Sequence, residues 1–387
     1  MSQKNNVYCP LIYQGMYVER RDSENSLVAP CCAAKGELFP NDQIDFDSNI
    51  FLQRLRKENA AGIASAECRE CWNSEKYQDT SRRIMSLRMS KLTDSIFDSS
   101  DHSFVNLDWN VEPICNGKCI ICSSYYSSAW AAEDSRFIGM YEFQRSLPDS
   151  KRNDIINSLD LTTLKKVYFN GGEPVLSQDP VNLLTKLDNM DRLSQVEVGF
   201  NMNGSTMPTT ELIRLLKKAK KTQLFVSIDG IEEKFEYIRN PLKWTDLEKN
   251  IKSLIELEFD ELFMITAVGI HNLQIAAETE KWWKTFTDQY QNSTTTIKHI
   301  CQLVHGTLSV NNISVALRDQ ILMDMQGADQ EPLYYHLGIN CLKTANGANG
   351  DNKWISWLEN LDQRRNLSWK ETFPALYNSA KAAGVIK

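Results

Sequence analysis

The chain has 387 residues and a mass of 44.3 kDa, which at about 150 residues per domain allows two or three domains. Hydrophobic residues make up 42% of the sequence and charged residues 24%. These fractions are typical of a soluble globular protein and exclude a mostly disordered or collagenous chain. The net charge of −7 disfavours general nucleic-acid binding, so we expect none.

No apolar run approaches the length of a membrane span, and the N-terminus, Met1–Asn6, leads into no apolar signal core. We therefore expect a cytoplasmic protein without a membrane partner. A reducing cytoplasm disfavours structural disulfides. Those of the ten cysteines that are clustered are accordingly expected to be metal ligands or catalytic thiols.

The first five cysteines are spread over the N-terminal region, at Cys9, Cys31, Cys32, Cys68 and Cys71. A CxxC pair and two distant cysteines can supply four thiolates to one metal centre. Four thiolates in a tetrahedral array suit either zinc or an iron–sulfur cluster. The residues alone leave both metals open.

A strand predicted over 104–111 leads into the CxxxCxxC of Cys115, Cys119 and Cys122, in which Gly117 allows the loop to curl. Three thiolates leave one position of a four-site cluster unfilled, whereas a structural zinc site needs four ligands. A [4Fe–4S] cluster held by three thiolates has one open iron, and this iron can bind a small molecule.

Five more strands are predicted, at 166–169, 195–201, 224–228, 262–270 and 296–304, with helical stretches at 209–221, 247–257 and 276–290. This alternation predicts a parallel sheet. Small or polar residues follow several of these strands. In Gly171–Pro174 the glycines allow the backbone to approach a ligand, and Glu173 can accept a hydrogen bond from a cation.

Taken in order, these motifs resemble those of the radical S-adenosylmethionine (SAM) superfamily. The resemblance implies a SAM-binding [4Fe–4S] cluster on Cys115, Cys119 and Cys122. Positions matching the family's SAM site are Gly171, Gly172, Glu173, Asn203, Ser227, Arg239, Val268 and Ile121. Ile121 stands where most members have an aromatic residue that touches the adenine, and an apolar side chain can still pack on a purine.

The resemblance also implies the architecture, an α/β fold with a partial (β/α)6 TIM-like barrel over 101–326. Residues 1–100 are expected to form a cysteine-rich segment and residues 327–387 a helical C-terminal extension. The N-terminal pattern, from Cys9-Pro10 to Cys71-Trp72, resembles the SPASM and twitch segments that carry auxiliary clusters. It implies a second, auxiliary [4Fe–4S] cluster, although such segments follow the core in the best-known members.

The ligands implied for the auxiliary cluster are Cys9, Cys31, Cys68 and Cys71, with Cys32 as the alternative to Cys31. In the last predicted strand, alternation places His299, Cys301 and Leu303 on one face. If that face lines the barrel, Cys301 is a candidate catalytic hydrogen-atom donor, and the alternative is a buried inert thiol. His271 follows the preceding strand and could touch adenine or substrate.

The function implied by the resemblance is that of a radical SAM oxidoreductase-type enzyme. Its cluster cleaves SAM reductively to a 5′-deoxyadenosyl radical, which abstracts hydrogen from a substrate. We expect a ribosomally made peptide or protein as substrate, modified by crosslinking, epimerisation or dehydrogenation, and an electron donor such as flavodoxin or ferredoxin. The alternatives are a small sugar or nucleoside substrate, and a non-catalytic metal-cluster regulatory or binding protein.

Overall fold

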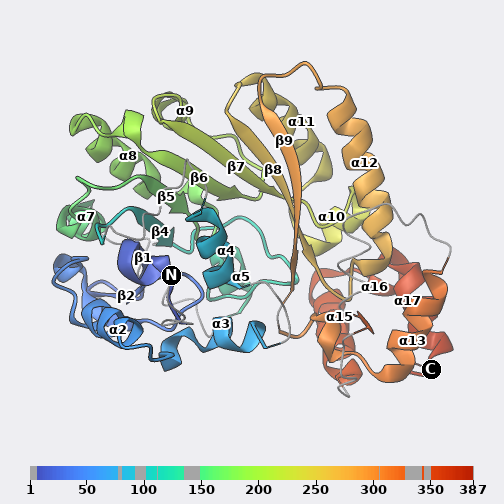
Figure 1. The fold of residues 1–387 in the computed structure, drawn as a ribbon. Coiled ribbons are helices and arrows are strands. Elements are labelled where there is room, and N and C mark those ends of the chain that lie inside the picture. The colour runs from blue at the N-terminus through green and yellow to red at the C-terminus, as the bar shows by residue number, and fades with distance from the viewer. Residues whose placement is uncertain are drawn as a thin grey trace. The chain divides into compact units, whose positions relative to one another are not determined.

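The computed structural model describes residues 7–76, 81–91, 102–110, 112–134, 149–304, 306–326, 342–343 and 350–386. The chain divides into two compact units, and Figure 1 shows their elements. The first unit comprises residues 1–115, 131–201 and 208–223, and the second comprises residues 116–130, 202–207 and 224–387.

The first unit contains a mixed sheet in the order β3-β2-β1-β4-β5-β6. Its strands are β1 (Gly15–Arg20), β2 (Asn25–Ala29), β3 (Glu37–Pro40), β4 (Asn106–Asn110), β5 (Lys166–Phe169) and β6 (Glu197–Met202). The first three strands pair antiparallel, whereas β1–β4, β4–β5 and β5–β6 are parallel pairs. The N-terminal segment thus contributes three strands to the sheet, and none of them was predicted.

Alternation along the parallel strands separates an apolar face from a polar one. Trp109, Phe169 and Phe200 are buried, and the Phe169 and Phe200 rings are in tilted contact with centroids 4.7 Å apart. On the opposite face Asp108 is in register with Tyr168, and Tyr168 with Gly199. We call the face that carries Asp108, Tyr168 and Gly199 the polar face of the first unit.

The helices of the first unit precede, separate and follow its strands along the chain. They are α1 (Pro10–Gln14), α2 (Ile50–Ala60), α3 (Arg69–Ser74), α4 (Arg82–Met89), α7 (Asp149–Ser158), α8 (Asp179–Asn189) and α9 (Thr210–Leu216). Asn49 caps α2 by accepting a hydrogen bond from the Leu52 amide. Helix α1 contacts both α2 and α4, which brings the N-terminal cysteine-bearing segments together.

The second unit contains the strand order β7-β8-β9. These strands are β7 (Lys221–Ser227), most of which lies in this unit, β8 (Glu261–Val268) and β9 (Thr296–Leu303). Its helices are α10 (Glu232–Ile238), α11 (Trp244–Glu256), α12 (Ala276–Asp288), α13 (Val315–Asp324), α15 (Asp351–Arg365), α16 (Trp369–Thr372) and α17 (Pro374–Ala382). A short helix, α5 (Ser128–Glu133), crosses the boundary between the units.

The predicted mixed α/β fold with a parallel sheet is confirmed, and strands β4 to β9 lie where the sequence predicts strands. The helix predicted over 209–221 ends earlier, at Leu216, because the Thr222 hydroxyl binds the Leu216 carbonyl and β7 begins at Lys221. Among the described residues, no helix has both the length and the apolar character needed to cross a membrane. The proposed boundaries at 100/101 and 326/327 stay predictions.

Gly199 provides a test of the packing on the polar face. A Cβ at this position would lie 2.3 Å from the Tyr168 ring. We expect Gly199→Ala to lower the free energy of unfolding by about 1–3 kcal/mol, because the ring must move out of a packed position. Urea unfolding followed by tryptophan fluorescence measures this loss.

Gly230→Ala is the matched control, because a Cβ there would meet only side-chain atoms, the nearest at 3.2 Å. Its effect should be clearly smaller. Equal losses in the two variants would show that contact with Tyr168 is not the cause.

Candidate functional site

The Gly-Gly-Glu turn after β5 packs against the segment that leads from β4 to Cys115. The Gly172 amide donates to the Glu112 carbonyl (3.2 Å) and the Glu173 amide to the Ile114 carbonyl (2.6 Å). A Cβ on Gly172 would lie 2.3 Å from the Ile114 carbonyl oxygen, and one on Gly171 would lie 2.7 Å from that of Glu112. Both glycines are therefore required for this close approach, which places the buried Glu173 beside the strand that precedes the cysteines.

The cysteine loop after Cys115, residues 116–122, has no regular secondary structure of its own and belongs to the second unit. The last residue of α10 and the segment after this helix hold its backbone in place. The Lys118 amide donates to the Asn240 carbonyl (2.5 Å), and the Ile120 amide to the Ile238 carbonyl (2.8 Å). These two bonds lie on either side of Cys119 and fix its position.

Side chains satisfy the loop carbonyls. The Ser127 hydroxyl binds Gly117 (2.6 Å), and the Trp130 indole N–H binds Cys119 (2.9 Å). Two residues of α15, far away in the sequence, complete the set. Trp357 donates to the Ile120 carbonyl (3.0 Å), and Arg365 to the Lys118 carbonyl (2.8 Å).

Three of these side chains, Trp130, Trp357 and Arg365, also pack on one another. Trp130 and Trp357 stack with centroids 5.7 Å apart, and the Arg365 guanidinium lies 4.4 Å from the centroid of the Trp130 ring. Trp354, in contrast, is fully buried against Trp369. The C-terminal helix α15 therefore supports the cysteine loop through its Trp357 side and packs into the core through its Trp354 side.

Asn203, predicted at the SAM site, contacts the start of the cysteine loop. Its amide donates to the Asn116 side-chain oxygen (2.8 Å), and its own oxygen accepts from the Ser205 amide and hydroxyl. Asn116 in turn donates to Ser205 (2.8 Å). This closed network holds the residue that follows Cys115.

Arg239 lies beside Cys119 in the second unit. Its guanidinium pairs with Asp229 at 2.7 Å and reaches the Cys119 sulfur at 3.7 Å, and both partners are buried. Burial raises the pKa of the Cys119 thiol, and the Arg239 charge opposes that rise. Burial and the neighbouring Cys119 raise the pKa of Cys122 to about 12. Arg239 is thus positioned to favour the thiolate form that binds metal.

The other predicted residues of the second unit occupy different surroundings. Ser227 is the last residue of β7 and is half-buried, whereas Val268 ends β8 in an apolar cluster on which Ile121 also packs. Cys301 lies on the more buried face of β9, with its sulfur 3.4 Å from His299 Nε2. Burial raises the pKa of Cys301 to about 12, so it is a neutral thiol at physiological pH.

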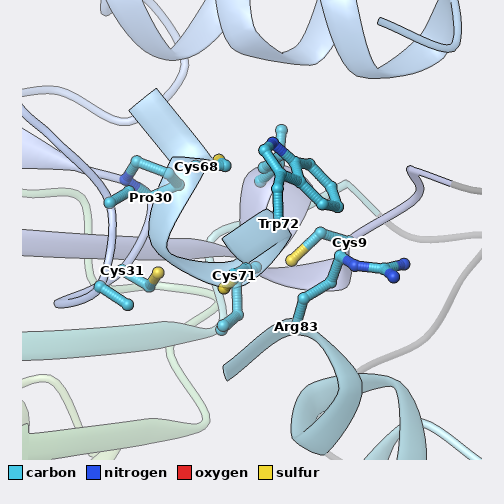
Figure 2. A pocket seen from close by; sticks show the side chains of 11 residues that line it. Cys9, Pro30, Cys31, Cys68, Cys71, Trp72 and Arg83 are labelled. Atoms are coloured by element: carbon cyan, nitrogen blue, oxygen red, sulfur yellow. The ribbon is translucent and has the colours of Figure 1, made fainter. Parts of the chain in front are cut away.

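Four N-terminal cysteines gather around one pocket of the first unit (Figure 2). Cys9 precedes α1, Cys31 follows β2, and Cys68 and Cys71 lie at the start and within the first turn of α3. Trp72 and Arg83 also line the pocket, with the Arg83 guanidinium 5.1 Å from the Trp72 ring centroid. The sequence therefore predicted a set of cysteines that the fold brings to one place.

Cys9, Cys31 and Cys71 are buried and Cys68 is half-buried, and the thiols are close enough to influence one another. Burial raises the pKa of Cys9 to about 11 and that of Cys68 to about 12, and the neighbouring thiols add to both. Yet in the described part of the chain no three His, Cys, Asp or Glu side chains are close enough to hold a single metal ion. Around tetrahedral zinc, thiolate sulfurs lie only about 3.8 Å apart, since each bond is about 2.3 Å.

Cys32 differs from its neighbour. Cys31 is 6% exposed and lines the pocket, whereas Cys32 is exposed and is not among the pocket residues. Close to Cys32, Arg82 pairs with the buried Asp108 of the polar face at 3.3 Å. Cys341, the other isolated cysteine, lies outside the described residues.

Sequence reasoning missed the residues that hold the site. Asp229 directly follows the strand predicted over 224–228, but the sequence did not indicate that it pairs with Arg239. Trp357 and Arg365 carry no local signal, because their partners are more than two hundred residues away.

Comparison with known proteins bears on the central part of the chain. Residues 109–281 match the model of the Radical SAM superfamily. A GTP 3′,8-cyclase of Desulforamulus reducens is 22% identical over 184 residues, which cover 47% of this chain and 52% of the cyclase. The chain thus matches about half the length of that relative.

Two solved structures also match parts of the chain at low identity. Native anSMEcpe with bound AdoMet is 15% identical, with a TM-score of 0.37, over 57% of this chain and 58% of that chain. Streptococcus suis SuiB bound to S-adenosylmethionine is 12% identical, with a TM-score of 0.28, over 74% and 70%. The residues that match the family model, 109–281, include Cys115, Cys119 and Cys122.

Replacing Arg365 tests whether α15 stabilises the cysteine loop. We expect Arg365→Ala to accelerate hydrogen exchange of the Lys118 and Ile120 amides about tenfold, because one hydrogen bond and one cation–π contact are lost. Exchange read by mass spectrometry on peptides covering 116–122 measures the effect.

Arg364→Ala is the control, because Arg364 is exposed on the same turn of α15. It should leave exchange in the loop unchanged. Unchanged exchange in the Arg365 variant as well would mean that α15 does not stabilise the loop.

Proposed function

We propose that this protein is a radical SAM enzyme whose SAM-binding [4Fe–4S] cluster is held by Cys115, Cys119 and Cys122. The observation that carries the proposal is the cysteine loop itself. Bonds to Asn240, Ile238 and α15 fix the backbone on both sides of Cys119, the central cysteine of this motif. Three thiolates with an adjacent guanidinium are a donor set that fits a cluster with one open iron.

When bound, the cluster and SAM together supply a 5′-deoxyadenosyl radical, which abstracts hydrogen from the substrate. The protein's own residues bind and orient. Glu173 is proposed to receive the SAM ammonium, and Gly171 and Gly172 allow the close approach to the Glu112 and Ile114 carbonyls that positions it. Ser227, Arg239 and Val268 are proposed to contact the remainder of SAM, and Asn203 holds Asn116 beside the first ligand.

Arg239 has two partners that together explain its proposed role. Its pairing with Asp229 fixes the guanidinium, and its contact with Cys119 places positive charge next to a ligand. A fixed guanidinium also suits a carboxylate, which it can bind through more than one N–H. Asp229 receives the Ala267 amide on its other oxygen (2.7 Å), so the ion pair is tied to the end of β8.

We further propose that Cys9, Cys31, Cys68 and Cys71 hold an auxiliary [4Fe–4S] cluster. Support comes from their convergence on one pocket of the first unit. The exposed Cys32 is not proposed as a ligand.

We propose that the parallel strands form the partial barrel expected of this superfamily, with the polar face lining its interior. The groups on that face include the Arg82–Asp108 pair and Tyr168, whose hydroxyl binds Asn201 at 2.9 Å. They support a polar substrate rich in hydrogen-bonding groups. We propose a ribosomally made peptide or protein, on the resemblance of the N-terminal cysteine pattern, with Cys301 as a candidate hydrogen-atom donor.

Iron content tests the two cluster sites together. We expect about eight iron per chain after anaerobic reconstitution, and about four in both the Cys115/Cys119/Cys122→Ala and the Cys9/Cys31/Cys68/Cys71→Ala variants. Cys32→Ala should keep about eight. 5′-Deoxyadenosine should form, with dithionite or reduced flavodoxin as donor, unless Cys115, Cys119 and Cys122 are replaced.

Cys68→Ala alone serves if the fourfold variant does not fold. Zinc in place of iron at the N-terminal site would contradict the auxiliary cluster, and it would leave the SAM site standing. A fully loaded SAM-site cluster that forms no 5′-deoxyadenosine would contradict the enzyme assignment.

The substrate class is tested separately. We expect a cell-extract fraction that accelerates 5′-deoxyadenosine formation to lose this effect after treatment with a protease, because the protease destroys a peptide substrate. The rate of 5′-deoxyadenosine formation is the measurement, and the same fraction with heat-killed protease is the control. An effect that survives proteolysis would favour a sugar or nucleoside.

A further inference from the structure

His271 is buried without a partner. It is 2% exposed, and neither ring nitrogen has a hydrogen-bond partner among the residues that the structure describes. Buried polar groups in folded proteins are almost always paired, because an unpaired one loses its bonds to water without compensation. Such a side chain indicates that another molecule supplies the missing partner.

The position of His271 is well defined. It lies three residues beyond the end of β8, in a turn that Asn272 fixes by donating to the Asp229 and Ala267 carbonyls (3.0 Å each). The Asn272 oxygen accepts from the Gly269 amide (2.9 Å). A Cβ on Gly269 would lie 2.9 Å from the imidazole, so this glycine allows the ring to fold back over the turn. The absence of partners is therefore not a result of a loose loop.

The imidazole is neutral at physiological pH. Burial lowers the pKa of His271 to about 3, and the positive charge of Arg239 contributes to the shift. A neutral imidazole carries one N–H donor and one lone pair. The ring therefore offers a hydrogen bond to an uncharged group and does not offer a charge.

We propose that His271 binds the adenosyl part of SAM through a ring nitrogen. The inference rests on the proposed function and adds to it a residue that recognises the nucleoside. Arg239, whose charge influences His271, also contacts the sulfur of Cys119, so the histidine lies near the proposed cluster ligand. Both belong to the second unit.

The surroundings favour the nucleoside over the amino-acid end of SAM. Val268, Ile270 and Leu308 belong to the buried apolar cluster that encloses this turn. A charged ammonium or carboxylate placed there would need an opposite charge, whereas a flat uncharged purine nucleoside needs apolar walls and a few hydrogen bonds.

The test compares His271→Leu with wild type in the reconstituted protein under anaerobic, non-reducing conditions. We expect SAM to bind roughly tenfold more weakly to the variant, measured by calorimetry, because a buried hydrogen bond to the ligand is lost. His271→Asn and His271→Gln each retain a donor and an acceptor. At least one of them should bind within about threefold of wild type.

A second readout does not depend on activity. Without SAM, His271→Leu should unfold at the same or a higher temperature than wild type, because two unpaired nitrogens are removed from the interior. His299→Leu is the matched comparison. His299 is also a neutral histidine and is half-buried, but its Nε2 lies 3.1 Å from Thr266 Oγ1, so its replacement should lower the unfolding temperature.

Competition with each half of SAM tests whether His271 binds the nucleoside or the amino acid. 5′-Deoxyadenosine should compete with SAM less well in His271→Leu than in wild type, and L-methionine should compete equally well in both. Unchanged SAM affinity, a selective loss of methionine competition, or a marked loss of stability without SAM would each overturn the inference. Wild-type protein that binds no SAM would instead overturn the proposed function.

Discussion

The structure depends on the main-chain hydrogen bonds of a loop that has no secondary structure. Within residues 116–122 only the Cys122 amide bonds a loop carbonyl, that of Cys119, and a buried backbone group without a partner is costly. The Lys118 and Ile120 amides bond the end of α10 and the segment after it, and their carbonyls accept from side chains of α15. The position of Cys119, which lies between these two residues, is thereby fixed, and such rigidity is what a cofactor site on a loop requires.

The N-terminal pocket obtains its geometry differently. Its cysteines lie at the ends of elements: before α1, after β2 and at the start of α3. Element ends have defined backbone directions, so side chains there point reproducibly even though the segments are short. The antiparallel β1–β3 unit and the contacts of α1 with α2 and α4 carry these ends to one place. Tertiary packing thus positions the cysteines of the N-terminal pocket, whereas hydrogen bonds position the cysteine loop.

Much of this organisation could be predicted from the sequence, and the exceptions have physical causes. Strands β4 to β9 are predicted by alternating or continuous apolar residues, and both cysteine sets are predicted by their spacing. Strand β1 does not, because all its residues are buried, including Glu19, whose carboxylate binds the Tyr17 hydroxyl. The role of Trp357 was hidden as well, because its partner is 237 residues away. For His271 the sequence indicated contact with adenine or substrate, but only the structure shows that the ring is buried.

The distance of α15 from the loop has a consequence for biosynthesis. Trp357 and Arg365 are separated from their loop partners by 237 and 247 residues. A ribosome making the chain from its N-terminus therefore releases the three cysteines long before it makes the helix that completes their surroundings. During this interval the loop is exposed to oxidants and to competing metals. For the proposed cluster, either the thiols would have to be shielded in the nascent chain or metal delivery would have to wait until α15 has been made.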